Sequence, residues 1–287
     1  MQFLRNILGF NNPDNPAPAP SVSSPPVTAS VSPGLKVGWA SDAGAVRHHN
    51  EDTALVITAA HNDESTLPAF GIFVLADGMG GHQAGEVASS LAARVAARHI
   101  VQYFYLPTLV SNERGTDQPA LKDVLVDAVR TSNAAVGDQV PGGGTTLTCA
   151  LVLGSRAYIA HVGDSRAYVA TEEELEQITH DHSLVDRLVE LGQLTPDEAA
   201  IHPQKNVLYR AVGQTGVLEV DTYIRTVPRG GRLLLCSDGL WSLVDEQEMA
   251  RIVAAAPSLD AACEKLIAAA NQSGGFDNIT AILVEPS

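Results

Sequence analysis

The stretch that decides the fold of this chain is GIFVLADGMGG, residues 71–81, where an apolar, β-prone run ends at Asp77 in a glycine-rich turn. Two later apolar runs, 157–162 and 233–236, are each followed by an aspartate within two residues. An unpaired buried carboxylate is very unfavourable, so acidic residues at strand ends are rarely there for packing. Several of them at one place are best explained by bound cations. The pattern therefore predicts a metal-dependent catalyst.

The 287 residues suggest one large domain or two small ones, and a hydrophobic content of 45% is enough to bury a sizeable core. A net charge of −15 and a pI near 4.9 disfavour nucleic-acid and anionic-membrane surfaces. No stretch approaches the ~18 consecutive apolar residues of a membrane span, and the N-terminus lacks the features of a secretory signal. We therefore expect a cytoplasmic monomer with no nucleic-acid partner and no membrane span.

Residues 11–34 contain seven of the 16 prolines, mixed with small and polar residues. Such a segment cannot bury enough surface to fold, so residues 1–34 are predicted to form a disordered, proline-rich tail. The simplest interpretation of the tail is a spacer, and the alternative is a docking peptide at residues 1–10. Globular structure is predicted to begin at Leu35 and to continue as one domain over 35–287.

Apolar and alternating runs bounded by turn residues predict the strands. In chain order these are 36–41, 53–58, 70–76, 145–153, 156–162, 167–170, 220–226, 231–236 and 279–284. A long helix is predicted at 84–103, with Val87, Leu91 and Val95 on its apolar face and Pro107 closing the segment.

A second long helix is predicted at 120–137, and two more begin near Asp245 and Ser258. Strands cluster and helices come in pairs, so strict β-α-β alternation is absent and the predicted fold class is α+β. A hairpin turn is expected at Gly154-Ser155. Residues 183–212 carry two helix-start signatures and are predicted to be a small helical insertion, a candidate lid.

Hard divalent cations such as Mg²⁺ and Mn²⁺ prefer carboxylate, carbonyl and water oxygens. The chain has no H-E-x-x-H motif and no Cys/His ligand spacing, which disfavours zinc. Asp77 is the natural bridging carboxylate, Gly78 lets its carbonyl approach an ion, and Asp238 and Asp277 arrive from later in the chain. Two metal ions ~3.5–4 Å apart could lower the pKa of a shared water and clamp both oxygens of an in-line displacement.

Phosphate esters are the substrates that suit such a site, and arginine holds phosphoryl oxygens in a fixed fork better than lysine does. Arg47, shortly before Glu51 and Asp52, is the best candidate for this role. Each acidic motif taken alone is more often an ordinary turn. The interpretation as a site therefore depends on the ordered ensemble.

That ensemble resembles a known family, the metal-dependent serine/threonine protein phosphatases of type 2C (the PPM family), in its bacterial branch. The matching segments occur in the family's order and cover 35–287. They are Arg47-x-x-Asn50-Glu51-Asp52, VLADGMGGH at 74–82, Gly144-Thr145-Thr146, Gly163-Asp164-Ser165-Arg166, SDGLW at 237–241 and Asp277-Asn278-Ile279-Thr280. The resemblance implies a four-layer α-β-β-α sandwich, in which two antiparallel sheets pack face to face and helix pairs cover their outer sides.

The same resemblance implies two Mn²⁺ or Mg²⁺ ions per chain in a channel between the sheets. Asp77 would bridge both ions, with the Gly78 carbonyl on one of them. Asp238 and Asp277 would be ligands of the other ion. Arg47 would clamp the phosphate.

Glu51 and Asp52 would act through metal-bound waters or at the edge of the ligand shell. Asp164, together with Asp238, is similar to the pair that holds a third, weaker metal ion in bacterial members. Residues 182–213 look like the variable flap beside the family's active site.

One position departs from the family pattern and concerns the leaving-group acid. Animal members carry a histidine directly after the Asp-Gly pair, whereas this chain has Met79, which cannot donate a proton. His82 lies three residues further on, and we do not transfer the role to it. A metal-bound water is the acid that we expect instead.

The resemblance thus implies a phosphoprotein phosphatase that hydrolyses phosphoserine and phosphothreonine through a water activated by the binuclear centre. Its partners would be phosphorylated proteins, the substrates of serine/threonine kinases. One alternative is a catalytically inactive relative that binds phosphoproteins as a regulatory module, which the presence of Asp77, Asp238 and Asp277 disfavours. The other is a hydrolase of small phosphate esters.

Overall fold

Strand β3 (Phe70–Met79), which contains the apolar run that leads to Asp77, is buried on both of its faces. Phe70 packs into one apolar core and Phe73 into another, because successive side chains of a strand point to opposite sides of the sheet. Leu75 follows Phe73 into the second core. A strand of this kind must have a layer packed against each face.

The computed structural model describes residues 34–59, 68–80, 83–110, 119–172 and 174–286. The predicted tail 1–34 lies outside these residues except for Gly34, and His82 lies outside them as well. In the described part of the chain, no helix is both long and apolar enough to cross a membrane.

The sheet that contains β3 has six strands, in the order β2-β3-β5-β6-β9, with the short β4 paired to the end of β3. Its other members are β2 (Asp52–Ala59), β4 (Gly144–Thr145), β5 (Leu147–Leu153), β6 (Arg156–Val162) and β9 (Asp221–Thr226). All neighbours are antiparallel. The predicted hairpin is confirmed, because Leu153 pairs with Arg156 and Gly154 takes a positive φ of 56° in the turn.

The second sheet has five strands in the order β1-β11-β10-β7-β8, and its neighbours are again antiparallel. The strands are β1 (Lys36–Asp42), β7 (Arg166–Ala170), β8 (Leu175–Gln177), β10 (Arg232–Cys236) and β11 (Ile279–Glu285). The strand β8 was not predicted, because a run of three residues carries no measurable periodicity.

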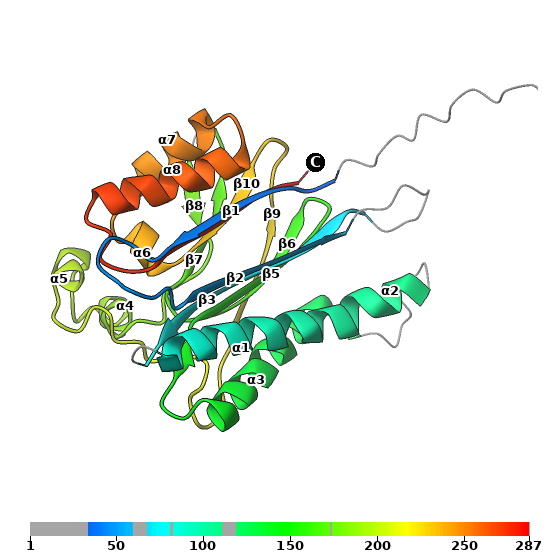
Figure 1. The fold of residues 1–287 in the computed structure, drawn as a ribbon, viewed down its shortest axis with the longest axis horizontal. Coiled ribbons are helices and arrows are strands. Elements are labelled where there is room, and N and C mark those ends of the chain that lie inside the picture. The colour runs from blue at the N-terminus through cyan, green and yellow to red at the C-terminus, as the bar shows by residue number, and fades with distance from the viewer. Residues whose placement is uncertain (1–33, 60–67, 81–82, 111–118, 173, 287) are drawn as a thin grey trace, which may run out of the picture. The chain divides into compact units, whose positions relative to one another are not determined.

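Helices cover the outer face of each sheet, and three separate apolar cores result (Figure 1). Helices α1 (Gln83–Ile100) and α3 (Leu121–Gln139) pack on the six-stranded sheet, and α7 (Glu246–Ala255) and α8 (Leu259–Gln272) on the other. The third core lies between the two sheets and joins Phe73 and Leu75 to Leu233 and Leu235 of β10. The predicted α+β class and four-layer sandwich are therefore confirmed.

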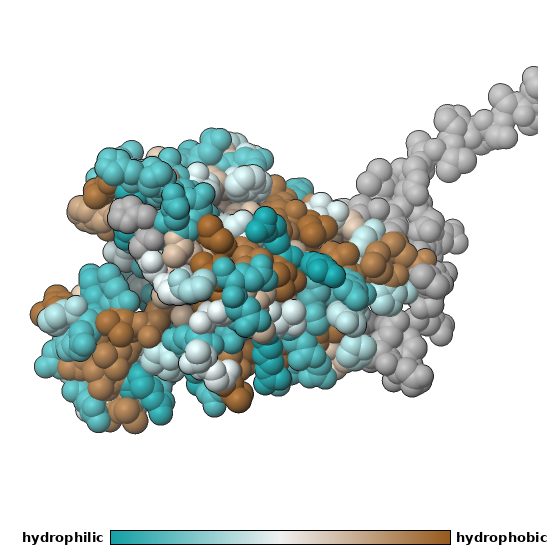
Figure 2. Space-filling view, turned by 60° about the horizontal axis from the view of Figure 1, so that its bottom comes forward, coloured by the Kyte–Doolittle hydropathy of each residue, from teal (hydrophilic) through white to brown (hydrophobic). Residues whose placement is uncertain are grey.

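The outer surface alternates in polarity along the face shown in Figure 2. Hydrophobic residues there form separate brown patches between hydrophilic, teal ones. Polar residues thus separate the apolar patches on this face, as on the surface of most globular domains.

Helix α1 buries a different face from the one predicted. Its buried side chains are mostly alanines, among them Ala88, Ala92 and Ala96, whereas Val87 is 50% exposed. Small side chains let α1 lie close to both β3 and α3, and a row of valines at the same place would hold them apart. The prediction of the buried face was therefore wrong, because Val87 is exposed and Leu91 is only partly buried.

The end predicted for this helix was also wrong. A π-helical turn, η1 (Val101–Tyr105), follows α1 and leads directly into α2 (Leu106–Val110), so Pro107 lies inside a helical segment. The backbone N–H of Leu106 bonds to the carbonyl of Val101, five residues back. A π-turn shifts the hydrogen-bond register, which lets a residue without an N–H be accommodated.

The predicted helical insertion is confirmed as α4 (Leu184–Glu190) and α5 (Pro196–Ala200). Ser183 caps the first helix, and Thr195 forms a capping box with Glu198 at the second. We call residues 182–213 the flap.

Candidate active site

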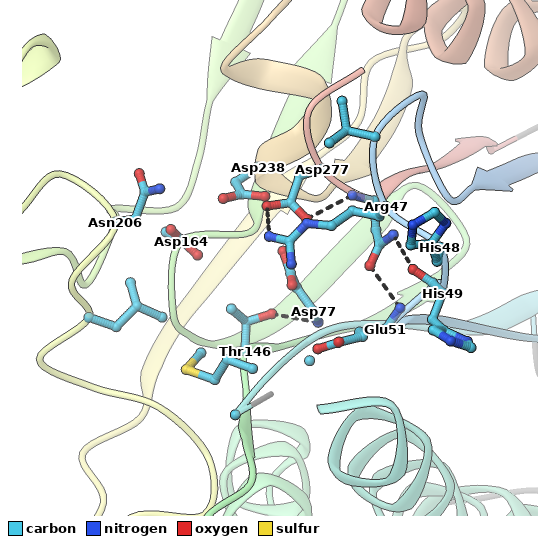
Figure 3. Close-up of a pocket in the computed structure, with 16 residues that line it drawn as sticks. Arg47, His48, His49, Glu51, Asp77, Thr146, Asp164, Asn206, Asp238 and Asp277 are labelled. Carbon is cyan, nitrogen blue, oxygen red and sulfur yellow. Dashed lines mark hydrogen bonds and ion pairs between the residues drawn. The ribbon is translucent and has the colours of Figure 1, made fainter. Parts of the chain in front are cut away.

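Loops at one end of the two sheets line a cavity of about 460 Å³ (Figure 3). Seven of the eight predicted site residues reach its wall, and they come from chain segments far apart in sequence. These residues are Arg47, Glu51, Asp77, Gly78, Asp164, Asp238 and Asp277. Asp52 is buried behind the wall, so the structure brings the predicted residues together in two layers.

Asp77 is positioned by pairing on both sides of β3. It lies opposite Asp52 of β2, and its backbone N–H donates to Thr146 Oγ1 at 2.9 Å. Its carbonyl accepts from the Thr146 N–H and from Thr145 Oγ1, both at 2.8 Å. Gly144 and Thr145 form β4, which pairs with Gly78 and Met79 and fixes the backbone of the Asp77 turn.

Asp52 is almost fully buried, and its two carboxylate oxygens differ in their hydrogen bonding. One oxygen, Oδ2, accepts from Ser237 Oγ at 2.7 Å and from Thr280 Oγ1 at 2.6 Å. Among the described residues, Oδ1 has no hydrogen-bond partner. Burial, opposed by these two hydrogen bonds, raises the pKa of Asp52 to about 7.

The other carboxylates of the site raise one another's pKa. Burial first, and then the charges of Asp52 and Asp238, hold the pKa of Asp77 well above its usual range. Burial and the charge of Asp238 do the same for Asp164. Burial and Asp277 raise the pKa of Asp238 to about 6. Since every shift opposes ionisation, the ionised set requires added positive charge.

Arg47 supplies one positive charge at the cavity wall. Its guanidinium donates to Asp277 Oδ2 at 2.7 Å and its side chain is 50% exposed. Figure 3 shows this side chain extending among the carboxylates of Asp77, Asp238 and Asp277. The group is thus held at the cavity by an ion pair and remains accessible from solvent.

Asn278 ties the Arg47 loop to the turn that carries Asp277. Its side-chain amide donates to the carbonyls of Ala43 at 3.0 Å and His49 at 2.8 Å. Its Oδ1 accepts from the Glu51 N–H at 2.8 Å. The sequence placed Asn278 in a motif without giving it a role, and the structure shows that it holds the Arg47 loop and the Asp277 turn together.

Close backbone contact explains two glycines at the site. A Cβ on Gly78 would lie 2.3 Å from the Gly85 carbonyl oxygen and 2.6 Å from that of Glu51. A Cβ on Gly85 would lie 2.1 Å from Glu51 Oε2. The start of α1 therefore approaches the Asp77 turn more closely than any side chain would permit.

The donor set fits hard divalent cations. It consists of carboxylate and carbonyl oxygens, and the buried Asp52 Oδ1 still has an acceptor site to fill. Within the described ranges, no three acidic, histidine or cysteine side chains already converge as a complete ligand group. Mg²⁺-type ions keep several waters and use few protein ligands, which agrees with carboxylates spread around an open cavity.

Sequence reasoning missed two residues of the cavity wall that the flap contributes. Asn206 and Leu208 line it, with Asn206 on the side away from Arg47 in Figure 3, and Leu208 is brought there by a bridge to Ser183. Neither residue belongs to a motif. Only the tertiary pairing of the flap's two ends places them at the site.

An α-β-β-α sandwich with a carboxylate-lined cavity at the end of its sheets indicates a metal-dependent enzyme. Comparison with known proteins identifies the family. The family model described as protein phosphatase 2C matches residues 50–270. The serine/threonine phosphatase stp of Listeria monocytogenes is 40% identical over 244 residues, which are 85% of this chain and 93% of the relative.

Two solved structures share the fold. The crystal structure of the Mycobacterium tuberculosis serine/threonine phosphatase PstP/Ppp has a TM-score of 0.72 at 35% identity and covers 88% of this chain and 98% of that one. A structure of the PstP catalytic domain with two manganese ions has a TM-score of 0.69 at 35% identity and covers 88% and 97%. This chain belongs to the protein phosphatase 2C family, and it is a metal-dependent serine/threonine phosphatase of the 2C type.

Proposed function

We propose that the carboxylate-lined cavity hydrolyses phosphoserine and phosphothreonine in proteins, with two divalent metal ions held by its aspartates. The observation that carries this proposal is electrostatic. Asp77, Asp164 and Asp238 come from separate segments of the chain, and burial and mutual repulsion raise the pKa of each. A group of this kind is costly unless cations compensate it.

Four residues that line the cavity are the metal ligands in this proposal. Asp77 would hold both ions, the Gly78 carbonyl would hold one of them, and Asp238 and Asp277 would hold the other. The wall contains all four of these residues. The ions are Mn²⁺ or Mg²⁺, because oxygen ligands without thiolate or imidazole suit both.

Three further carboxylates have supporting roles in the proposal. Glu51 lines the cavity and Asp52 lies behind it, so both act through waters or at the edge of the ligand shell. Asp164 lines the same cavity as Asp238, whose charge raises the pKa of Asp164, and this pair would take a third, weaker ion. When bound, the metal ions would lower the pKa of a water and offset charge on the phosphoryl oxygens.

Arg47 is the phosphate clamp in this proposal. Its guanidinium is half exposed and is paired with Asp277, so a phosphoryl group can exchange places with that carboxylate without burying a new charge. A planar fork of N–H donors suits two phosphoryl oxygens at once.

The proton for the leaving alcohol comes from water. Met79 lines the cavity directly after the Asp77-Gly78 pair, and its thioether has no proton to give. The physiological substrates would be phosphorylated proteins produced by serine/threonine kinases. We propose that the enzyme acts on them as a cytoplasmic monomer.

The test is hydrolysis of a phosphothreonine peptide by the full chain with EDTA, with Mn²⁺, and with Mn²⁺ after Asp238→Asn. We expect activity to require Mn²⁺ and to fall by at least ~10²-fold in the variant, since Asp238 serves the reaction's charge stabilisation. Asp260→Asn, in the first turn of α8, is the matched control and should keep full activity.

A wild-type protein as inert with Mn²⁺ as the variant would sink the proposal and favour the binding-module alternative. A high kcat/KM for small phosphate esters with none for the peptide would favour the small-ester hydrolase.

A further inference from the structure

Gly163, the residue before Asp164, is held from two sides by buried histidines. Its N–H donates to His182 Nδ1 at 3.0 Å, and its carbonyl accepts from the His182 N–H at 2.8 Å and lies 3.0 Å from His161 Nε2. Gly163 has a φ of 115°, and a Cβ there would lie 2.6 Å from the Thr146 side chain. The backbone that aims Asp164 is therefore constrained at both of its polar groups.

The contact to Gly163 determines the tautomer of His182. A backbone N–H can only donate, so Nδ1 must accept and the ring proton must sit on Nε2. Nε2 lies 3.3 Å from Asp221 Oδ2 on β9, and burial lowers the pKa of this histidine, which keeps the ring neutral. Arg210 in turn donates to Asp221 Oδ1 at 3.0 Å. Asp221 thus orients the ring that holds Gly163.

His182 is also the first residue of the flap and pairs with the flap's other end. Its carbonyl accepts from the Tyr209 N–H at 2.9 Å, and the Leu184 N–H donates to the Val207 carbonyl at 2.7 Å. These bonds close a two-stranded stem, and the stem carries Leu208, with Asn206 beside it, on the cavity wall. One residue therefore joins the flap stem to the Asp164 loop.

The far side of the Asp164 loop has independent anchors. Arg166 donates to both carboxylate oxygens of Asp181 at 2.8 to 3.1 Å and lies 3.6 Å over the ring of Trp241. Trp241 Nε1 donates to the Asp164 carbonyl at 3.0 Å. Loss of the His182 ring should therefore leave the Gly163 N–H without its acceptor and remove the ring contact to Tyr209 of the stem, without unfolding the whole loop.

We propose that His182 is a positioning residue of the phosphatase, which couples the flap to the Asp164 side of the cavity through Gly163 and is itself oriented by Asp221. The inference rests on the proposed function, because Asp164 matters only if the cavity is the reaction site. The ring touches neither the cavity nor the substrate. It acts through the backbone of Gly163 and the stem that carries Asn206 and Leu208.

The test compares three substitutions at His182 in the full chain with Mn²⁺. Asn places its Oδ1 near the position of Nδ1 and can still accept from Gly163, whereas Gln places its amide near Nε2, and Ala removes both. We expect kcat on a phosphothreonine peptide to fall ~10-fold in His182→Ala and His182→Gln, and His182→Asn to restore most of it. Asp221→Asn, away from the cavity wall, should reproduce part of the loss.

A second measurement does not depend on activity. Trypsin cleavage at the exposed Lys205 of the flap, measured in the metal-free protein, should be faster in His182→Ala than in wild type and slow again in His182→Asn. His180→Ala removes an exposed histidine two residues away and is the matched control for both measurements.

Wild-type kcat and wild-type cleavage in His182→Ala or Asp221→Asn would overturn the inference. A lower melting temperature with unchanged kcat would also overturn it, since it would show a purely structural role. Where His182→Ala does not fold, Asp221→Asn and His182→Asn decide the matter by the same criteria. If the wild type itself has no Mn²⁺-dependent activity, the proposed function fails, and the cleavage measurement still tests the coupling.

Discussion

Burial and hydrogen bonding act against each other on the carboxyl group of Asp52. Burial favours the protonated form, whereas the hydroxyls of Ser237 and Thr280 favour the ionised form, and burial is the larger effect. Because the Asp52 pKa is about 7 in the folded protein and 3.8 in an unperturbed carboxyl, the folded state binds a proton more tightly than the unfolded state.

The first prediction concerns the stability of the metal-free protein. The contribution of Asp52 is fully present below pH 3.8 and is lost as the pH rises through about 7, because the unfolded state then binds fewer protons. We expect the free energy of unfolding in EDTA, measured by urea denaturation, to fall between pH 5 and pH 8. Saturating Mn²⁺ should reverse the fall, by about 2.7 kcal/mol at a hundredfold excess over Kd.

Asp52→Asn is the control for this prediction, since the amide does not titrate. Its stability should fall less between the same two pH values. Equal pH dependence in the variant and the wild type would show that Asp52 is not responsible.

The second prediction concerns the geometry of Arg47. Lysine keeps the charge but loses the fork of donors, so Arg47→Lys should retain only part of the activity. We expect kcat/KM for a phosphothreonine peptide to fall about 10²-fold in Arg47→Ala and by a smaller factor in Arg47→Lys. Arg229→Lys, an exposed change in the turn before β10, should have no effect. A fully active Arg47→Ala would remove Arg47 from the proposed mechanism.

At the scale of elements, helix α1 shows where periodicity alone misleads. A valine or leucine every fourth residue marks an apolar stripe, but alanine is equally able to face a core when two layers must lie close. The buried row of Ala88, Ala92 and Ala96 is invisible to a hydrophobic scale that ranks valine higher. Packing against β3 and α3 decides which stripe is buried, and that partner is known only in the folded protein.

The third prediction follows from this packing. Ala96 is completely buried between α1 and its neighbours, so Ala96→Leu forces extra volume into a filled layer. We expect the variant to lose about 1–3 kcal/mol of unfolding free energy in urea denaturation. Val87→Leu, on the same helix at a half-exposed position, should change stability by less than ~0.5 kcal/mol. The reverse order would restore the valine face as the buried one.

Most strands and turns could be predicted because their signals are local. The hairpin at Gly154-Ser155 and the caps at Ser183 and Thr195 depend on a few neighbouring residues, and the structure confirms each. Several short elements could not be predicted, η1 and α2 among them. Strand β8 forms only because β7 lies beside it, and α6 (Asp238–Trp241) is a single turn after Asp238.

The candidate site divides in the same way. Its acidic residues could be predicted because each one ends an apolar run or lies in a recognisable motif. Asn206, Leu208 and the ring of His182 could not, because tertiary contacts alone bring the flap to the cavity.

At the scale of the molecule, one apolar core lies between the two sheets and one lies between each sheet and its helices. The cavity lies where the two sheets end. Strand β3, which carries Asp77, and strand β10, which ends two residues before Asp238, belong to different sheets, and the core between the sheets sets their separation. The rigid packing of that core therefore helps to position the site residues, since a close-packed interior transmits small shifts of one sheet to the other.

The last prediction concerns the N-terminal boundary of the catalytic domain, which we propose lies at residue 35. Strand β1 begins at Lys36, whose Nζ lies 2.6 Å from Glu285 Oε1 of its partner strand. Removal of residues 1–34 should leave both kcat/KM for a phosphothreonine peptide and the melting temperature unchanged. A large loss of activity in this truncated protein would show that the tail takes part in catalysis.

Removal of β1 as well is the contrasting case. Ser41 at its end lies 2.8 Å from Thr280 Oγ1 and accepts from Asn50 Nδ2 at 2.8 Å, and Thr280 donates to Asp52 behind the cavity. A protein that begins at residue 43 would expose the edge of β11 and break this chain of hydrogen bonds. We therefore expect it to lose activity together with stability, because the edge strand of the sheet is also a support of the site.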